Sequence, residues 1–353
     1  MSTRTYADYS QPLWRRLALT REAAVIALLV IVVLYALTSV QYFDSKLTLT
    51  YLFLDVAPIL LIALPMTLVI ATGEIDLSVA SVVGLSSVLV GVLHQGGMSI
   101  PLAGVIALVA GVVCGVINGY LVAYVGLPSL AVTIGTLALF RGLAVGLLGT
   151  TAVTDFPKTW TDLAKAQIAG TGIPLITVPF LVLAVIFALL LHFSAFGRGI
   201  YDIGLNTEAA LFTGVYVKRT KLILFVLTGV VSAFAGIYYT LRFGSARGDN
   251  ATGLELQVIA AVLLGGVSIF GGRGKLAGVI AGVLLIGVIS SALRLQGVTV
   301  NVINIIIGLL LVASVVSTSV LAWVSDVAAR RNRQGTRPQQ MPSGVGTHRE
   351  VQP

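Results

Sequence analysis

Two stretches of this sequence read identically, Leu-Ala-Gly-Val-Ile-Ala at residues 102–107 and again at residues 276–281. A Gly-Gly pair precedes each copy, and a carboxylate-Leu-polar-Val run lies further upstream of each, at 76–79 and at 255–258. Six apolar letters can coincide by chance in a hydrophobic chain, but three features in the same order are much harder to dismiss. The sequence therefore predicts two related halves, an arrangement typical of membrane transporters.

The composition indicates a chain that lies in lipid. Of its 353 residues, 57% are hydrophobic and 10% are charged, and its mean hydropathy is +1.00. Soluble domains carry about 25% charged residues. Runs of about 20 apolar residues, long enough to cross the hydrocarbon core, recur along nearly the whole sequence. Because lipid offers the backbone no hydrogen-bond partners, each run should be helical. We predict an all-α polytopic membrane protein with about ten transmembrane helices, at 22–40, 51–72, 77–95, 101–123, 128–149, 175–193, 222–242, 254–271, 276–293 and 300–322.

The two copies of the repeat should cross the membrane in opposite directions, because they lie in the fourth and ninth predicted spans, which are five positions apart, an odd number. This predicts two inverted five-helix repeats related by a pseudo-two-fold axis in the membrane plane. We expect a single transmembrane domain at 22–322, preceded by a cytoplasmic segment at 1–21. Residues 323–353 are rich in Gly, Pro, Gln and Arg, and we expect them to form a disordered basic tail.

The Lys and Arg residues predict the orientation. With the N-terminus inside, the inner segments hold 15 of them and the outer segments hold six, which predicts that both termini lie in the cytoplasm. The net charge of +8 reflects this bias and gives no reason to expect nucleic acid as a partner. Cys114 is the single cysteine and the three His residues are far apart, so we expect no metal site.

Ionisable residues at membrane depth are the first candidates for function. Glu74 and Asp76 lie in the run 72–78, where Gly73 can break a helix and Asp76 or Ser78 can cap the next one. The run is either a broken helix whose ends line a path or gate, or a tight cytoplasmic turn capped by its own carboxylate. Glu255 holds the matching position of the second half. If the run 72–78 lines a path across the membrane, Glu255 should lie at the other end of that path.

Arg141 lies in the middle of a predicted span, and we expect it to pair with a carboxylate or with interior polar groups. The alternative is snorkelling towards an interface. Hydroxyl and amide side chains suit a sugar path, but they suit helix–helix contacts in lipid equally well. The remaining path candidates are Asn118, Thr133, Thr136 and Gln257.

The inner connection at 194–221 is long and basic at its end. Asn206 or Thr207 can cap a short helix that starts near Glu208 and ends near Gly214. The connection is either a docking element or a solvated loop with ordinary inner-side charge. The outer connection at 150–174 fits an interfacial helix, a lid or a plain loop. A phosphate-binding loop, a nucleophile elbow and an HExxH motif are all missing from the sequence, so we expect no catalytic residue and no cofactor in this chain.

Three motifs resemble the permease subunits of bacterial ABC sugar importers of the ribose, rhamnose and autoinducer-2 group. They are Gly-Glu-Ile-Asp-Leu-Ser-Val at 73–79, the Gly-Arg…Tyr-Asp-Ile-Gly-Leu-Asn-Thr-Glu-Ala-Ala run at 197–210, and the run at 255–274 that ends in Gly-Gly-Arg-Gly. The resemblance covers nearly all of 22–322 and is strongest for the rhamnose-type members. The sequence departs from the usual pattern at Ala80, Asp202 and Leu205.

The resemblance implies a type II-like ABC importer permease with several partners. These are a second permease subunit, identical or related, and a cytoplasmic ATPase that holds ATP and Mg²⁺ and docks on the inner connection. An extracytoplasmic solute-binding protein delivers the sugar, and membrane lipid surrounds the assembly. The residues implied in docking are Arg198, Tyr201, Asn206, Glu208, Ala209 and Arg219.

Two other classes of protein fit part of the pattern. A secondary transporter driven by H⁺ or Na⁺ would also show inverted repeats and buried carboxylates, but it has no obvious need for the capped basic inner loop. A membrane enzyme or scaffold has little support, because the sequence shows no reactive constellation.

Overall fold

The computed structural model describes residues 21–313 and residue 316, and these are predominantly helical. The chain divides at residue 314 into two units, and the second, Val315–Pro353, lies outside the described residues except for residue 316. The predicted N-terminal segment, apart from Arg21, and the predicted tail at 323–353 also lie outside them. The helices are α2 (Arg21–Ser39), α3 (Lys46–Ala71), α4 (Val79–Gln95), α5 (Ile100–Tyr120) with a π-helical extension η1 (Leu121–Val125), α6 (Ser129–Leu148), α7 (Lys158–Lys165), α8 (Thr177–Phe193), α9 (Ala195–Leu205), α10 (Thr207–Phe212), α11 (Val217–Phe243), α12 (Leu254–Leu264), α13 (Leu276–Leu295) and an unlabelled helix Val300–Ala313.

The predicted all-α membrane class is confirmed. Within the described ranges, six helices are long and apolar enough to cross a membrane, and α8 with α9 would make a seventh although the pair is bent by 66°. The helices α4, α12 and Val300–Ala313 are apolar but shorter. Each predicted span overlaps one of these helices, while the number of crossings stays a prediction.

One predicted boundary is wrong. The span expected at 254–271 ends at Leu264, where Gly265 and Gly266 follow. A Cβ on Gly265 would lie 2.5 Å from the Cα of Val279, and Gly266 has a φ of +93° that favours glycine. The chain therefore leaves the helix at this point and α13 packs against the exposed backbone.

The order of the elements repeats along the chain. A long helix, α3, is followed by the shorter α4 and then by α5, and a second long helix, α11, is followed by the short α12 and then by α13. The duplicated six-residue segment begins within the first turn of both α5 and α13. The sequence repeat thus marks equivalent helices.

The two long helices exchange partners between the halves. Helix α11 packs against α4 and α5, whereas α3 packs against α12 and α13, and the two long helices also contact one another. Glycines permit the closest of these contacts: a Cβ on Gly111 of α5 would lie 2.6 Å from the carbonyl oxygen of Gly229 in α11. This reciprocal packing is what a two-fold relation between the halves produces.

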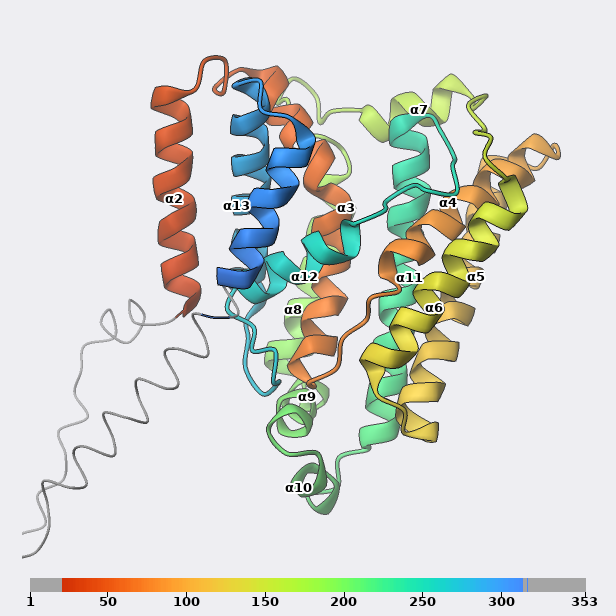
Figure 1. Ribbon diagram of the computed structural model, residues 1–353, viewed down its shortest axis with the longest axis vertical. Coiled ribbons are helices and arrows are strands. Elements are labelled where there is room, and N and C mark those ends of the chain that lie inside the picture. The colour runs from red at the N-terminus through yellow and green to blue at the C-terminus, as the bar shows by residue number, and fades with distance from the viewer. Residues whose placement is uncertain (1–20, 314–315, 317–353) are drawn as a thin grey trace, which may run out of the picture. The chain divides into compact units, whose positions relative to one another are not determined.

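Each short helix begins after a segment that turns back into the molecule. The chain after α3 rises from the lower end of that helix to about the middle of the view, where α4 begins (Figure 1). Residues 244–253 descend from the upper end of α11 to α12, which also begins near the middle (Figure 1). Helices α9 and α10 lie at the opposite end of this unit from α7 (Figure 1).

Candidate functional site

Three segments that are distant in the sequence meet at the end of α3, and four glycines form the contact. We call Gly73, Gly204, Gly271 and Gly272 the glycine junction. The backbone N–H of Gly272 donates to the carbonyl oxygen of Ala71 at 2.9 Å. A Cβ on Gly204 would lie 2.0 Å from the same oxygen and 2.3 Å from the nitrogen of Gly272. The three sequence motifs that carry the family resemblance therefore come together at one place.

The glycine junction excludes side chains for two reasons. A Cβ on Gly271 would lie 2.8 Å from both the Cα of Gly204 and the nitrogen of Gly73. Gly73, Gly271 and Gly272 also have φ values of +82°, +82° and +73°, which favour glycine. Beside the junction, the Tyr201 hydroxyl donates to the carbonyl oxygen of Gly274 at 2.7 Å. The end of α9 is thus bonded directly to the turn that precedes α13.

The inner connection contains two helices, of which the sequence predicted only α10. Asn206 is its cap: the side-chain oxygen accepts from the N–H of Ala209 at 2.9 Å. Thr207, the alternative cap, is instead the first residue of α10. The segment 194–205, for which no helix was predicted, forms α9, and Ser194 caps it by accepting from the N–H of Gly197 at 3.0 Å.

We call α9, α10 and the chain up to Arg219 the docking element. Its predicted contact residues Arg198, Glu208, Ala209 and Arg219 are all exposed. Large apolar side chains are exposed beside them, with Phe212 at 92% and Tyr216 at 78% of full exposure. A cavity of about 500 Å³ opens on this surface between Tyr124, Leu211 and residues 214–219. The element therefore presents mixed charged and apolar surface.

Asp76 is buried, and its carboxylate is held by three donors. The N–H and hydroxyl of Ser78 donate to Oδ1 at 2.9 and 2.6 Å, and the Thr228 hydroxyl donates to Oδ2 at 3.0 Å. The Asn118 amide in turn donates to the Ser78 hydroxyl at 2.7 Å. Of the two caps that the sequence offered for α4, the Ser78 side chain makes no capping bond, while the Asp76 carboxylate accepts from the N–H of Ser78, the N-cap residue of α4. The carboxylate itself lies at the N-terminus of α4, where the helix dipole favours negative charge.

Glu74 forms an ion pair with Lys221, and both side chains are largely buried. Lys221 lies in the first turns of α11, directly after the docking element. Thr133 of α6 donates to the carbonyl oxygen of Ile75 at 3.2 Å, so a third element holds this loop. Thr136 donates within its own helix, to the carbonyl oxygen of Val132 at 3.1 Å. The loop 72–78 is therefore fixed from α6 and α11, and its carboxylates are paired or hydrogen-bonded.

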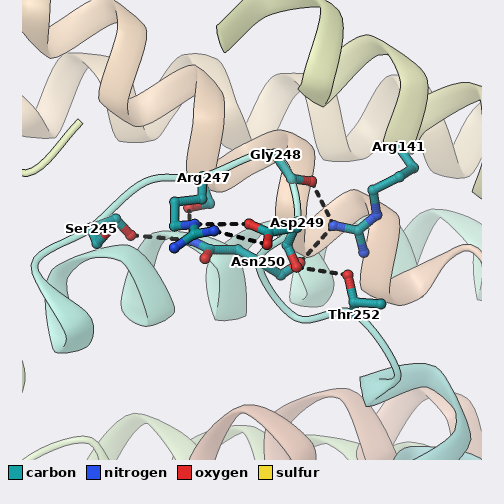
Figure 2. Close-up of polar contacts among 8 residues, drawn as sticks. Arg141, Ser245, Arg247, Gly248, Asp249, Asn250 and Thr252 are labelled. Atoms are coloured by element: carbon teal, nitrogen blue, oxygen red, sulfur yellow. Dashed lines mark hydrogen bonds and ion pairs between the residues drawn. The ribbon is translucent and has the colours of Figure 1, made fainter. Parts of the chain in front are cut away.

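Arg141 pairs with carbonyl oxygens and with no carboxylate in the described part of the chain. Its guanidinium donates to Gly248 at 2.8 Å, to Asn250 at 2.7 Å and to Ala80 at 3.2 Å, and Figure 2 shows the first two of these contacts. Gly84 leaves the space for the side chain, because a Cβ there would lie 2.6 Å from the guanidinium. Arg141 thereby anchors the returning segment 244–253 to α6 and α4, as the interior alternative predicted.

The same segment carries an internal ion pair. Arg247 and Asp249 approach to 2.9 Å and are both largely exposed (Figure 2). Glu255 follows in the first turn of α12, and its partly buried side chain has an oxygen without a hydrogen-bond partner among the described residues. Glu255 forms no ion pair with Arg141 in this part of the chain. Gln257, two residues further along α12, lines a separate cavity beside α3.

The structure thus divides the path candidates among three places. Asp76, Ser78 and Asn118 form one buried network, Arg141 of α6 binds the returning segment 244–253, and Gln257 lines a cavity. The sequence analysis missed Thr228, Lys221 and Asp55. Asp55 lies inside a predicted span, so the rule for ionisable residues at membrane depth identifies it, whereas a Thr and a Lys near a helix start carry no such signal. Within the described ranges, no group of His, Cys, Asp or Glu is arranged to hold a metal ion.

Comparisons with known proteins agree that this chain is similar to the permease subunits of transport systems. A family profile described as "Branched-chain amino acid transport system / permease component" matches residues 48–315. The autoinducer 2 import system permease protein LsrD of Escherichia coli strain K12 is 38% identical over 324 residues, which cover 90% of this chain and 97% of the relative. The protein of the same name from Shigella flexneri gives the same values. That from Escherichia coli O157:H7 is 38% identical over 284 residues, which cover 79% of this chain and 86% of the relative. No solved structure gives a significant match.

Proposed function

Because the chain belongs to the family of permease components of the branched-chain amino acid transport type, we propose that it forms the membrane path of an ATP-driven importer for a small hydroxylated, sugar-like solute. The chain is a multi-pass transport subunit and not an enzyme, as the sequence predicted. Permeases of this kind work with an ATPase and a solute-binding protein. The site of each contact, the second permease subunit and the solute are parts of the proposal.

Two names for the solute compete, and they come from different comparisons. The family description names branched-chain amino acids, whereas the relatives that are 38% identical over 90% of the chain are named as importers of autoinducer 2. The match to the relatives is specific in sequence and nearly full in length. We therefore favour autoinducer 2 or a monosaccharide such as rhamnose or ribose over an amino acid.

The glycine junction is the observation that carries an ATP-driven mechanism. It joins the exposed docking element to the loop 72–78 and to the turn before α13 through backbone contacts. At the glycine junction the backbones touch directly, with no flexible side chain between them. A displacement of α9 must therefore move the loop 72–78, the turn before α13, or both. An ATPase bound at the docking element would thus bias the packing of both halves between two arrangements.

The orientation follows from the same element. If α9 and α10 face the cytoplasm, α7 faces the outside, and the binding protein delivers its solute at that end (Figure 1). The 15 inner Lys and Arg residues against six outer ones support this direction and cytoplasmic termini. The exposed apolar faces of the long helices would then contact lipid or a second permease subunit.

Charge reversal on the docking element tests the proposal. In proteoliposomes that contain the permease, its ATPase and its binding protein, Arg198→Glu and Glu208→Arg should abolish uptake while ATP hydrolysis continues. Lys165→Glu is the control for the end where the binding protein delivers the solute, because Lys165 is exposed on α7. Excess binding protein should overcome a loss of uptake in this variant but not in Arg198→Glu or Glu208→Arg. Normal uptake by the two variants would refute docking at this element. Uptake driven by an ion gradient without ATP would refute the ATP-driven mechanism and establish a secondary transporter.

A further inference from the structure

A cavity of about 340 Å³ lies between α3, α11, α12, α13 and the helix Val300–Ala313. Its wall combines apolar residues with a carboxylate, a guanidinium, amides and hydroxyls. The polar side chains that matter here are Asp55, Gln257, Ser290, Arg294 and Asn304. Cavities of 300–1,000 Å³ with a few convergent polar groups are typical sites for small molecules.

Asp55 of α3 is the centre of the charged part of this wall. Its Oδ2 lies 3.1 Å from Nη1 of Arg294 in α13, and its Oδ1 lies 3.4 Å from Nη2 of Arg242 in α11. Arg242 is only 8% exposed and stacks over the rings of Tyr51 and Phe243. Its buried Nε has no hydrogen-bond partner among the described residues. The cluster is buried and packed against aromatic rings on the Arg242 side, and it is not saturated with protein hydrogen bonds.

The uncharged polar groups of the wall are free. Within the part of the chain that the structure describes, the side chains of Gln257, Ser290 and Asn304 have no hydrogen-bond partner. Amides and hydroxyls that converge on one cavity without protein partners are available to a ligand that both donates and accepts hydrogen bonds.

Asp55 and Arg294 also line a second cavity of about 400 Å³, beside Leu47 and Tyr51 at the start of α3. The start of α3 is the end remote from the docking element, because the other end of α3 contacts α9. The Asp55–Arg294 ion pair therefore stands between the two cavities. Asp55 and Arg294 are thus shared by both cavities, whereas Gln257 and Asn304 line only the first.

We propose that the cavity beside Gln257 and Asn304 is a binding site for a small neutral polyhydroxylated solute within the membrane domain. The hydroxyl groups of such a solute match the carboxylate, the guanidinium and the free amides, while Phe243 and Ile303 supply an apolar wall. An amino acid fits less well, because Asp55 already has two guanidinium partners and leaves its ammonium group without a counterion. The site deepens the proposed function and rests on it.

Protection of an introduced cysteine tests the site in the assembled transporter. Cys114 is the single native cysteine, so Asn304→Cys in a Cys114→Ala background gives one reactive thiol in the cavity. Autoinducer 2, L-rhamnose or D-ribose, whichever the transporter takes up, should slow modification by a small charged thiol reagent at least fivefold. L-leucine should not slow it. Thr299→Cys is the control, since Thr299 is exposed near the same helix end and does not line the cavity.

The outcomes separate the site from the proposed function. If a sugar is taken up but leaves the modification rate of Asn304→Cys unchanged, or protects Thr299→Cys equally, the site is refuted while the permease function stands. Protection by L-leucine refutes the chemical class. If no hydroxylated solute is taken up at all, the proposed function is refuted, and the site, which rests on it, is refuted with it. Gln257→Met should further lower uptake at subsaturating sugar about tenfold, with ATP hydrolysis retained; unchanged uptake would also refute the site.

Discussion

Asp76 shows how this chain tolerates a carboxylate in the membrane domain. Among the described residues it has no basic partner, and three hydrogen bonds from Ser78 and Thr228 carry its stabilisation. Burial of an unpaired polar group costs free energy unless donors replace water. The network therefore explains why the short run 72–78 needs hydroxyl-bearing residues on two helices. The bonds favour a structural reading of Asp76, in which it fixes the start of α4.

Thr228→Val isolates one of these bonds with little change in shape. The variant leaves Oδ2 of Asp76 without its donor, so the free energy of unfolding should fall by about 1–3 kcal/mol. Thermal unfolding of the purified permease in detergent measures the loss. Thr136→Val is the control, because the Thr136 hydroxyl bonds only carbonyl oxygens of its own helix, and its effect should stay within about 0.5 kcal/mol. Equal losses for both variants would contradict the role given to Thr228.

At the scale of the elements, the sequence predicts the long helices well and the short ones poorly. Apolar runs identify spans because the membrane selects for length, and this holds from α2 to α13. Helix α9 was missed because Gly197, Gly199 and Gly204 argue locally against a helix. The structure requires two of them for packing: a Cβ on Gly197 or on Gly204 would lie 2.0 Å from a carbonyl oxygen. Tertiary contact thus overrides the local preference.

The candidate site was predicted residue by residue, but its connections were not. Glu74, Asp76 and Arg141 stand out as ionisable residues in apolar surroundings. Their partners lie far away in the sequence, since Lys221 is 147 positions from Glu74 and Thr228 is 152 positions from Asp76. A single sequence carries no signal for such pairs, because a Thr or Lys looks ordinary until the helices are placed.

Asn206→Ala tests the cap of α10. Loss of an N-cap side chain costs about 1 kcal/mol, which is large for a helix of six residues with little packing. The helix should fray, and uptake should fall severalfold at unchanged permease stability, because the fault is confined to the docking element. Asn206→Asp keeps an accepting oxygen and should restore uptake. Normal uptake by Asn206→Ala would show that α10 does not need its cap for docking.

Arg141→Met tests the anchor of the returning segment 244–253. The variant removes three hydrogen bonds from a charged donor, and each such bond contributes about 1.5–3 kcal/mol. Uncompensated carbonyl oxygens should lower the thermal midpoint of the purified permease by well over ten degrees or prevent its accumulation. Arg247→Met is the matched control, because Arg247 belongs to an exposed pair and should change the midpoint little. A stable Arg141→Met variant would refute the anchoring role.

At the scale of the whole membrane unit, each half is held together by the long helix of the other. Helix α11 packs against α4 and α5, and α3 packs against α12 and α13, so a displacement of either long helix disturbs the packing of both halves. The glycine junction lies where α3 ends and where the docking element joins it. In the mechanism we propose, a displacement of α9 would reach the first half through Ala71 and Gly73, and the second half through Gly271 and Gly272, which are the residues it contacts.

Gly204→Ala tests this transmission directly. The new Cβ would lie 2.0 Å from the carbonyl oxygen of Ala71, so α9 must separate from the end of α3 and from Gly272. Uptake in proteoliposomes should fall at least tenfold, while the ATPase still copurifies with the permease and hydrolyses ATP. Gly135→Ala is the control, because a Cβ there meets nothing within 4 Å and uptake should be unaffected.

Tyr201→Phe adds no bulk and removes only the bond to Gly274, so it should lower uptake in part. If Gly204→Ala and Tyr201→Phe both transport at the original rate per ATP hydrolysed, the glycine junction does not transmit the ATPase motion, and another contact of the docking element must do so.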